Sequence, residues 1–124
     1  MRKARITAGD ASLDIVLKDT PTADAIWDAL PVSSVASTWG EEVYFSVPVS
    51  QPREDDARDL LEMGEIAFWP DGDAVAVVFG RTPISGPGEM RLASAGNIWA
   101  QADGDPTVMR SVRRGDSVRV ERLS

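Results

Sequence analysis

Six side chains of this sequence have the types and the spacing to form a ligand site: four large aromatic rings, one carboxylate and one guanidinium. They are Trp39, Glu42, Tyr44, Trp69, Arg81 and Trp99. Aromatic rings offer apolar faces to a ligand, and a guanidinium can hold a carboxylate or a carbonyl through directed hydrogen bonds. Surplus rings that a small core cannot accommodate would form an exposed apolar patch or groove. The set therefore predicts a face that binds a small organic ligand or an extended peptide.

Each of these residues also has a purely structural interpretation. Core packing is the commoner role of any single large ring, and Arg81 could equally pair with Glu41, Glu42 or another acid. Arg81 follows Phe79 by two positions in what looks like the end of a strand, so both side chains would lean to the same side. The ligand interpretation therefore depends on which rings the fold leaves outside its core.

Catalysis is the alternative to binding. Glu42 as a base, Tyr44 as an acid and Arg81 could serve an unknown lyase or hydrolase, or a weak prolyl isomerase. However, Glu41 and Glu42 are adjacent on a strand and must face opposite sides, so they are not a catalytic pair. The sequence contains no histidine and no cysteine, which removes the commonest general base and the commonest metal ligands. We therefore assign no catalytic residue, metal or cofactor.

Composition narrows the range of partners. The chain has 124 residues with a net charge of −7, which argues against nucleic acid and against an anionic membrane. Nowhere do eighteen apolar residues run together, and the segment after the basic start lacks the apolar core of a signal peptide. We expect one domain over residues 1–124 and a cytoplasmic location. A symmetric homo-oligomer that buries the same aromatic face is a third functional class.

The elements that would position the six residues are mostly strands, because the dominant hydrophobic period is two. Strands are predicted at 5–8, 13–18, 35–39, 42–47, 65–69, 74–79, 97–102 and 117–123. On two of them Tyr44 and Phe45, and likewise Phe68 and Trp69, must point to opposite faces. A helix is predicted over 20–30, with a hydroxyl cap and an early proline, and short helical segments at 54–61 and 105–112. This order fits a mainly β protein, an antiparallel barrel with one good helix and one or two short ones.

Five short motifs occur in an order that carries a family resemblance. They are Thr-Pro-Thr-Ala at 20–23, Trp-Gly-Glu-Glu-Val-Tyr-Phe at 39–45, Gly-Glu-Ile-Ala-Phe-Trp-Pro at 64–70, Phe-Gly-Arg-Thr-Pro at 79–83 and Gly-Asn-Ile at 96–98. From about Arg5 onward the chain resembles the bacterial and archaeal cyclophilin-like proteins of unknown function. The resemblance implies a closed cyclophilin-like barrel of about eight strands with helices at its ends. It does not imply prolyl isomerisation, because the pocket histidine and the Phe-His-Arg type of motif are missing.

Overall fold

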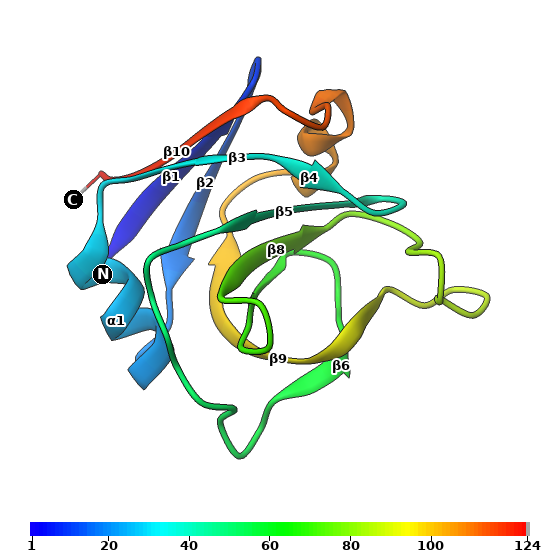
Figure 1. Ribbon diagram of the computed structural model, residues 1–124, viewed down its shortest axis with the longest axis horizontal. Helices are drawn as coiled ribbons and strands as arrows, with labels where there is room; N and C mark the ends of the chain where they lie inside the picture. Colours follow the sequence, from blue (N-terminus) through cyan, green and yellow to red (C-terminus); the bar gives the residue numbers. More distant parts are fainter. Residues whose placement is uncertain (124) are drawn as a thin grey trace.

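The computed structural model describes residues 1–123 and shows a strongly curved antiparallel sheet with one α-helix and one 3₁₀ helix (Figure 1). The first half of the chain contains β1 (Lys3–Ala8), β2 (Ala11–Leu17), α1 (Pro21–Ala29), β3 (Val32–Val35), β4 (Ser37–Thr38) and β5 (Glu42–Ser46). The second half contains β6 (Arg58–Leu60), β7 (Glu65–Trp69), β8 (Ala74–Val78), β9 (Arg91–Ala102), η1 (Pro106–Ser111) and β10 (Ser117–Arg122). The mainly β class predicted from the sequence is confirmed.

Helix α1 forms where its capping residues predict it. The Thr20 hydroxyl accepts a hydrogen bond from the backbone N–H of Ala23 at 3.1 Å, and Pro21 occupies the first turn. These contacts satisfy one orphan donor and remove another, which is how an N-terminus is normally completed. Ala23 and Ile26 are buried against the sheet, and the helix ends at Ala29 before Leu30. The predicted helix over 20–30 is therefore confirmed.

The predicted closed barrel of about eight strands is wrong. The sheet has ten strands, with β6 paired only to β9 and the others in the order β3-β10-β1-β2-β9-β7-β8-β5-β4. Its two edge strands, β3 and β4, follow one another in the chain with only Ala36 between them. They therefore meet end to end rather than side by side, and within residues 1–123 no ladder joins them. The Ala36 N–H instead donates a hydrogen bond to the carbonyl of Asp116, the residue before β10, at 2.8 Å.

The two predicted short helical segments have different outcomes. Residues 106–111 form η1, where the Asp105 carboxylate accepts a hydrogen bond from the Thr107 N–H at 3.0 Å. The helical turn predicted after Glu54 is wrong, because the chain there makes only a turn and then β6. Strand pairing with β9 and an ion pair between Arg58 and the buried Glu65 hold this segment extended.

The sheet formed by β5, β8 and β7 is covered on both faces, and this arrangement creates the candidate site. On one face Val43 and Phe45 of β5 join the main hydrophobic core. On the other face a smaller cluster packs against Tyr44. The buried members of this smaller cluster are Leu61, Ala67, Ala76, Val78 and Leu92. Because both faces are covered, all five residues of β8 are buried.

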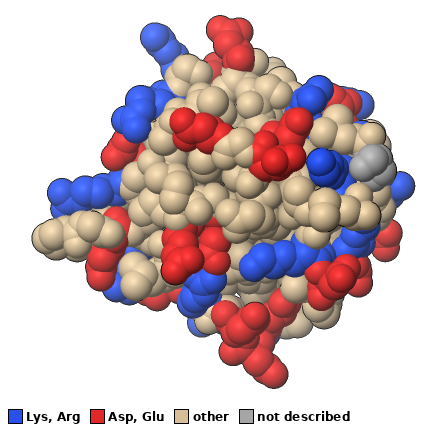
Figure 2. Space-filling model, turned by 180° about the vertical axis from the view of Figure 1, so that it is seen from behind, with Lys and Arg blue, Asp and Glu red and all other residues tan. Residues whose placement is uncertain are grey.

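The surface carries acidic and basic groups side by side. On the side opposite to that of Figure 1, blue and red groups alternate around a mostly uncharged centre (Figure 2). No basic patch gathers on that face, so the electrostatic footprint of a nucleic-acid interface is not seen there. Among residues 1–123, no helix combines the length and the apolar composition needed to span a bilayer.

The two covered faces predict unequal costs for two neighbouring aromatic truncations. Phe68 is fully buried in the main core, whereas Trp69 on the opposite face is only partly buried. Phe68→Ala is expected to lower the free energy of unfolding by about 3–5 kcal/mol, as other buried Phe→Ala changes do. Trp69→Ala should cost clearly less, and urea unfolding of both variants measures the difference. Equal losses would contradict the assignment of the two faces.

Candidate functional site

A cavity of about 160 Å³ lies on the second face of the β5–β8–β7 sheet. Four of the six residues singled out in the sequence line it: Trp39, Glu42, Tyr44 and Trp69. Ala74 and Ala76 of β8 and Leu92 and Ala93 of β9 complete the lining. The surface is predominantly apolar, so the Glu42 carboxyl is the exceptional group in it.

Strand register explains how residues distant in sequence reach one cavity. Tyr44 lies directly opposite Ala76, and Trp69 lies directly opposite Ala74. Directly opposed residues of antiparallel strands share a face, and residues two apart on one strand do too. Glu42, Tyr44, Ala74, Ala76 and Trp69 therefore all project from the same side of the sheet. The alanines leave space between the larger side chains.

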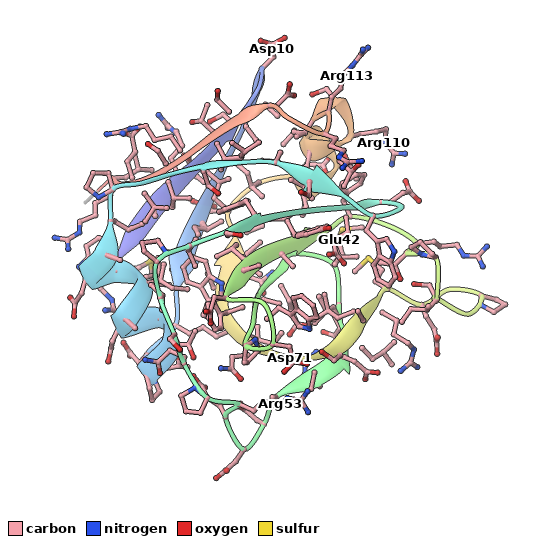
Figure 3. All side chains as sticks on the ribbon, viewed as in Figure 1. Asp10, Glu42, Arg53, Asp71, Arg110 and Arg113 are labelled. Atoms are coloured by element: carbon pink, nitrogen blue, oxygen red, sulfur yellow. The ribbon has the colours of Figure 1, made fainter. Side chains whose placement is uncertain are left out.

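The Trp69 wall is held in place by a chain of polar contacts. The indole N–H of Trp69 donates to the Ser94 hydroxyl on β9, and that hydroxyl donates to Asp71 at 2.8 Å. Arg53 pairs with the same Asp71 carboxylate at 3.1 Å, and both residues are labelled in the lower half of Figure 3. Gly72 lies so close to the Trp69 ring that a Cβ at that position would overlap it. These contacts fix the orientation of the ring.

The Trp39 wall is positioned by a tight turn. The Trp39 N–H donates to the Glu42 carbonyl at 3.0 Å, which closes the turn from β4 into β5. Gly40 within it has φ +62, and a Cβ there would lie 2.8 Å from the Arg81 carbonyl oxygen. Only glycine combines this backbone conformation with this close approach. The turn therefore brings Trp39 back beside the first residue of β5.

Glu42 is a buried carboxyl with an unsatisfied oxygen. The residue is only 6% exposed, and its Oε1 has no hydrogen-bond partner within residues 1–123. Its opposite residue on β8 is Val78, which offers no donor. Loss of hydration raises the pKa of the Glu42 carboxyl from 4.5 to about 7. In Figure 3 Glu42 lies on the inner side of β5, away from the outward-pointing Arg110.

The neighbouring Glu41 shows the contrasting environment of the opposite side. Its carboxylate pairs with Arg110 at 2.7 Å and accepts a hydrogen bond from the Arg81 backbone N–H at 3.2 Å. The two acids therefore do not act together: Glu41 lies in the turn before β5, and Glu42 is the first residue of the strand. Glu41 fastens β5 to its neighbours, and only Glu42 lines the cavity.

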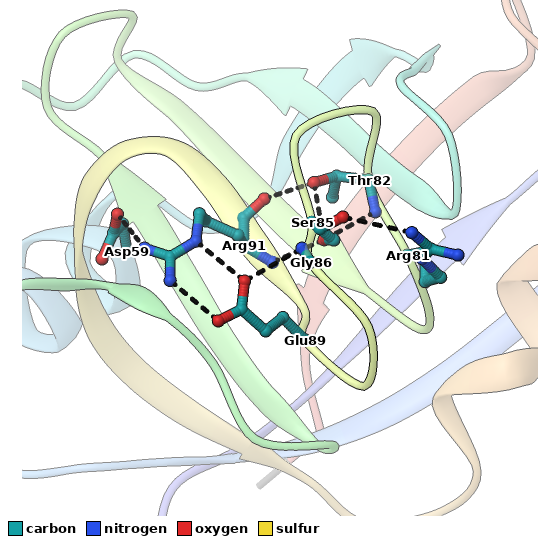
Figure 4. Close-up of polar contacts among 7 residues, drawn as sticks. All are labelled: Asp59, Arg81, Thr82, Ser85, Gly86, Glu89 and Arg91. Carbon is teal, nitrogen blue, oxygen red and sulfur yellow. Dashed lines mark hydrogen bonds and ion pairs between the residues drawn. The ribbon is translucent and has the colours of Figure 1, made fainter.

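The loop from Arg81 to Arg91 directly precedes the lining residues Leu92 and Ala93 and is closed by its own hydrogen bonds (Figure 4). The Ser85 hydroxyl accepts hydrogen bonds from the backbone N–H groups of Thr82 and Arg91, each at 3.0 Å. Glu89 and Asp59 then bind the Arg91 guanidinium at 3.1 and 2.8 Å. The Arg91 guanidinium also lowers the pKa of the Glu89 carboxyl. This network anchors the loop to β6.

Two residues singled out in the sequence do not reach the cavity. Arg81 is exposed, and its guanidinium donates to the Ser85 carbonyl at 3.3 Å within its own loop. Trp99 is fully buried in the main core, where its indole nitrogen has no hydrogen-bond partner among residues 1–123. The structure thus brings together Trp39, Glu42 and two other predicted residues, but neither Arg81 nor Trp99.

Sequence reasoning missed the small residues that make the cavity. Ala74 and Ala76 recur two positions apart in a strand that is otherwise valine, so a small-residue stripe on one face was visible. Leu92 and Ala93 carried no comparable signal, because the first half of β9 was not predicted as a strand. The burial of Glu42 also had no signal in its sequence neighbourhood.

A family model described as cyclophilin-like matches residues 2–121. The chain belongs to the cyclophilin-like family. No curated protein sequence matches this cyclophilin-like chain. The family match covers the strands that form the cavity and the turn that carries Trp39.

Solved structures that share this cyclophilin-like fold include the following two. The hypothetical protein AF2241 from Archaeoglobus fulgidus is 36% identical with a TM-score of 0.83, over 98% of this chain and 95% of that one. McbB, solved in complex with tryptophan, is 14% identical with a TM-score of 0.71. That match covers 98% of this chain but only 45% of McbB. The first supports close kinship, and the second shows the fold alone.

The buried Glu42 carboxyl predicts an unusual dependence of stability on pH. Its native pKa of about 7 exceeds the ordinary 4.5, so between these values the folded chain binds more protons than the unfolded chain. This contribution to stability is therefore present at pH 4 and lost as the pH rises through 7. Glu42→Gln removes it, so the variant should gain about 3 kcal/mol relative to the wild type between pH 4 and pH 8.

Urea unfolding of both proteins across this range measures the difference. Glu41→Gln is the matched control, because the neighbouring Glu41 pairs with Arg110 and does not line the cavity. The free energy of unfolding of Glu41→Gln, relative to that of the wild type, should not increase between pH 4 and pH 8. If the free energies of unfolding of Glu42→Gln and the wild type differ by the same amount from pH 4 to pH 8, the desolvation of Glu42 is contradicted.

Proposed function

We propose that this cyclophilin-like protein is a binding module and that the cavity beside Glu42 holds a small organic ligand. The observation that carries the proposal is a predominantly apolar cavity with one buried, unsatisfied carboxyl oxygen. Ligand sites characteristically combine apolar walls with a few convergent polar groups that fix orientation. An unsatisfied buried oxygen costs free energy in the free protein, and a bound donor would offset that cost.

The size of the cavity indicates the size of the bound group. A cavity of about 150 Å³ in another protein interior accommodates benzene, whereas drug-sized ligands occupy roughly 300–1,000 Å³. The volume of about 160 Å³ found here therefore suits one ring or one branched group. An extended peptide could insert only a single side chain. The proposal therefore favours a small ligand over a peptide groove.

The comparison with McbB supports the proposal at the level of the fold. That protein, of which 45% matches this chain, was solved in complex with tryptophan, a small molecule that carries an aromatic ring. The low identity means that no McbB residue is carried over to this chain. The proposal for this chain rests on its own lining residues, with Trp39 and Trp69 as the aromatic walls.

Acid–base catalysis at Glu42 is the second candidate. The observation that favours it is the pKa of about 7, which lets this carboxyl both take up and release a proton near neutral pH. Tyr44, two residues along the same face, is the other ionisable group of the lining. Arg81 lies outside the lining, so a reaction would have to proceed without a guanidinium clamp. Binding therefore ranks first.

A larger side chain at one of the β8 alanines that line the cavity tests the binding function. Ala76→Val adds two methyl groups on the cavity side of β8, where a β-branched residue suits the strand. Benzyl alcohol is a neutral, ring-sized probe, and its binding should quench the fluorescence of Trp39 and Trp69. We expect saturable quenching in the wild type and at least a tenfold loss of affinity in Ala76→Val. A fluorescence titration measures both.

Two further variants control this titration. Trp27→Phe removes a tryptophan that lies outside the cavity, stacked 4.7 Å from the Arg122 guanidinium, and should leave the quenching unchanged. Ala74→Val narrows the same cavity from the neighbouring position and serves if Ala76→Val does not fold. Retention of full affinity in a folded cavity-filling variant would contradict the proposed site.

A further inference from the structure

The lining of the cavity contains one acid and no basic side chain. Its ionisable members are Glu42 and Tyr44, and the remaining residues are tryptophan, alanine and leucine. A buried carboxyl normally has a basic or hydrogen-bonding partner, because desolvation of an unpaired carboxylate is costly. Glu42 is 6% exposed and has an oxygen without any partner within residues 1–123.

The chain has thirteen basic residues, and four arginines on β6, β9, η1 and the loop after β8 have partners other than Glu42. Arg110 pairs with Glu41, Arg91 pairs with Glu89 and Asp59, and Arg58 pairs with Glu65. The Arg81 guanidinium donates to the Ser85 carbonyl in its own loop. Within residues 1–123 none of these four cations pairs with Glu42, whose Oε1 has no hydrogen-bond partner. A bound ligand can therefore supply the missing partner.

The walls around this carboxyl suit a cation as well. Trp39, Tyr44 and Trp69 all line the same cavity. Aromatic faces attract organic cations through the ring quadrupole, tryptophan most strongly, and the attraction grows when the cation loses its water. The contacts from Ser94 and Gly72 fix the Trp69 ring in advance. A preorganised aromatic enclosure with one carboxylate is complementary to an ammonium group.

We propose that the ligand of this cavity is a small organic cation whose ammonium group pairs with the Glu42 carboxylate between the rings of Trp39, Tyr44 and Trp69. This inference rests on the proposed binding function and specifies its ligand class. At pH 8, where Glu42 is ionised, an anionic ligand is repelled by this carboxylate and finds no basic side chain in the lining. A neutral ligand would use the ring-lined space but would leave the charge of Glu42 uncompensated.

Three probes of one size and different charge test the proposal. Benzylamine is cationic at pH 8, benzyl alcohol is neutral and benzoate is anionic, and each carries one ring on one carbon. We expect benzylamine to bind at least tenfold more tightly than benzyl alcohol at pH 8, and benzoate not to bind. Isothermal titration calorimetry on the intact protein measures all three affinities.

Glu42→Gln separates charge from shape in the same titration. The variant should lose at least tenfold in affinity for benzylamine and clearly less in affinity for benzyl alcohol, because an amide oxygen still accepts a hydrogen bond from a hydroxyl but carries no charge. Glu41→Gln is the matched control and should change neither affinity, because Glu41 pairs with Arg110 and does not line the cavity.

The pH dependence provides an independent readout. Protonation of Glu42 competes with the ammonium group, and Tyr44 is the only other titratable residue of the lining. With a carboxyl pKa of about 7, benzylamine should bind about tenfold more weakly at pH 6 than at pH 8. Benzyl alcohol should show no such loss.

The outcomes distinguish this inference from the function on which it rests. Equal affinities for benzylamine and benzyl alcohol, or no effect of Glu42→Gln on benzylamine, would overturn the cation proposal while leaving a binding cavity. Failure of all three probes to bind would overturn the binding function itself. A stronger response to Nα-acetyl-lysine methylamide than to benzylamine would overturn the small-molecule ligand and identify a peptide lysine as the cation.

Discussion

The alternation of side chains along β5 is the constraint on which the rest of the structure depends. Val43 and Phe45 must enter the main core, so Glu42 and Tyr44 must occupy the opposite face. A one-residue slip would place the carboxyl in the core and Phe45 outside, and the apolar core prevents it. The second face is itself covered by a smaller hydrophobic cluster. The carboxyl is therefore desolvated as a consequence of how the sheet is held.

A desolvated carboxyl without a partner lowers the stability of the free protein at neutral pH. The structure retains it beside rings whose orientation is fixed by contacts outside the cavity, such as the Trp69–Ser94 hydrogen bond. A group that lowers stability locally but is surrounded by rigidly held side chains is typical of a functional site rather than of a hydrophobic core. Adjacent Glu41, fully paired with Arg110, shows that this sequence readily satisfies an acid where only structure is at stake.

The sequence predicted most of the strands and the principal helix because these depend on local patterns, whereas β6 and the first half of β9 were missed. Period-two alternation identified the opposite faces of Phe68 and Trp69, and the Thr20 cap located α1. Closure of the sheet was mispredicted because it depends on where β3 and β4 meet in space. The helical turn after Glu54 was mispredicted because pairing with β9, a long-range contact, overrides local preference.

The candidate site was predictable in part for the same reason. Aromatic residues and Glu42 could be singled out by type, and their strand parity placed some of them on one face. Trp99 lies in the main core, and the Arg81 guanidinium bonds to its own loop. Both placements depend on packing between distant segments, which the sequence does not reveal. Glu42 is unpaired because no cation within residues 1–123 reaches it. Predicting this from the sequence would require knowing the partner of every basic side chain around it.

Glu42 is a buried carboxyl that has no partner within residues 1–123 of the free protein and pairs with a bound organic cation. The titration of the Glu42 carboxyl tests this most directly. Carbon-13 NMR of the Glu42 side-chain carboxyl can be followed with pH, with Glu42→Gln used to assign the resonance. The account predicts a midpoint near pH 7 in the free protein and a clearly lower midpoint in saturating benzylamine. A midpoint near the ordinary 4.5, or one that benzylamine leaves unchanged, would contradict it.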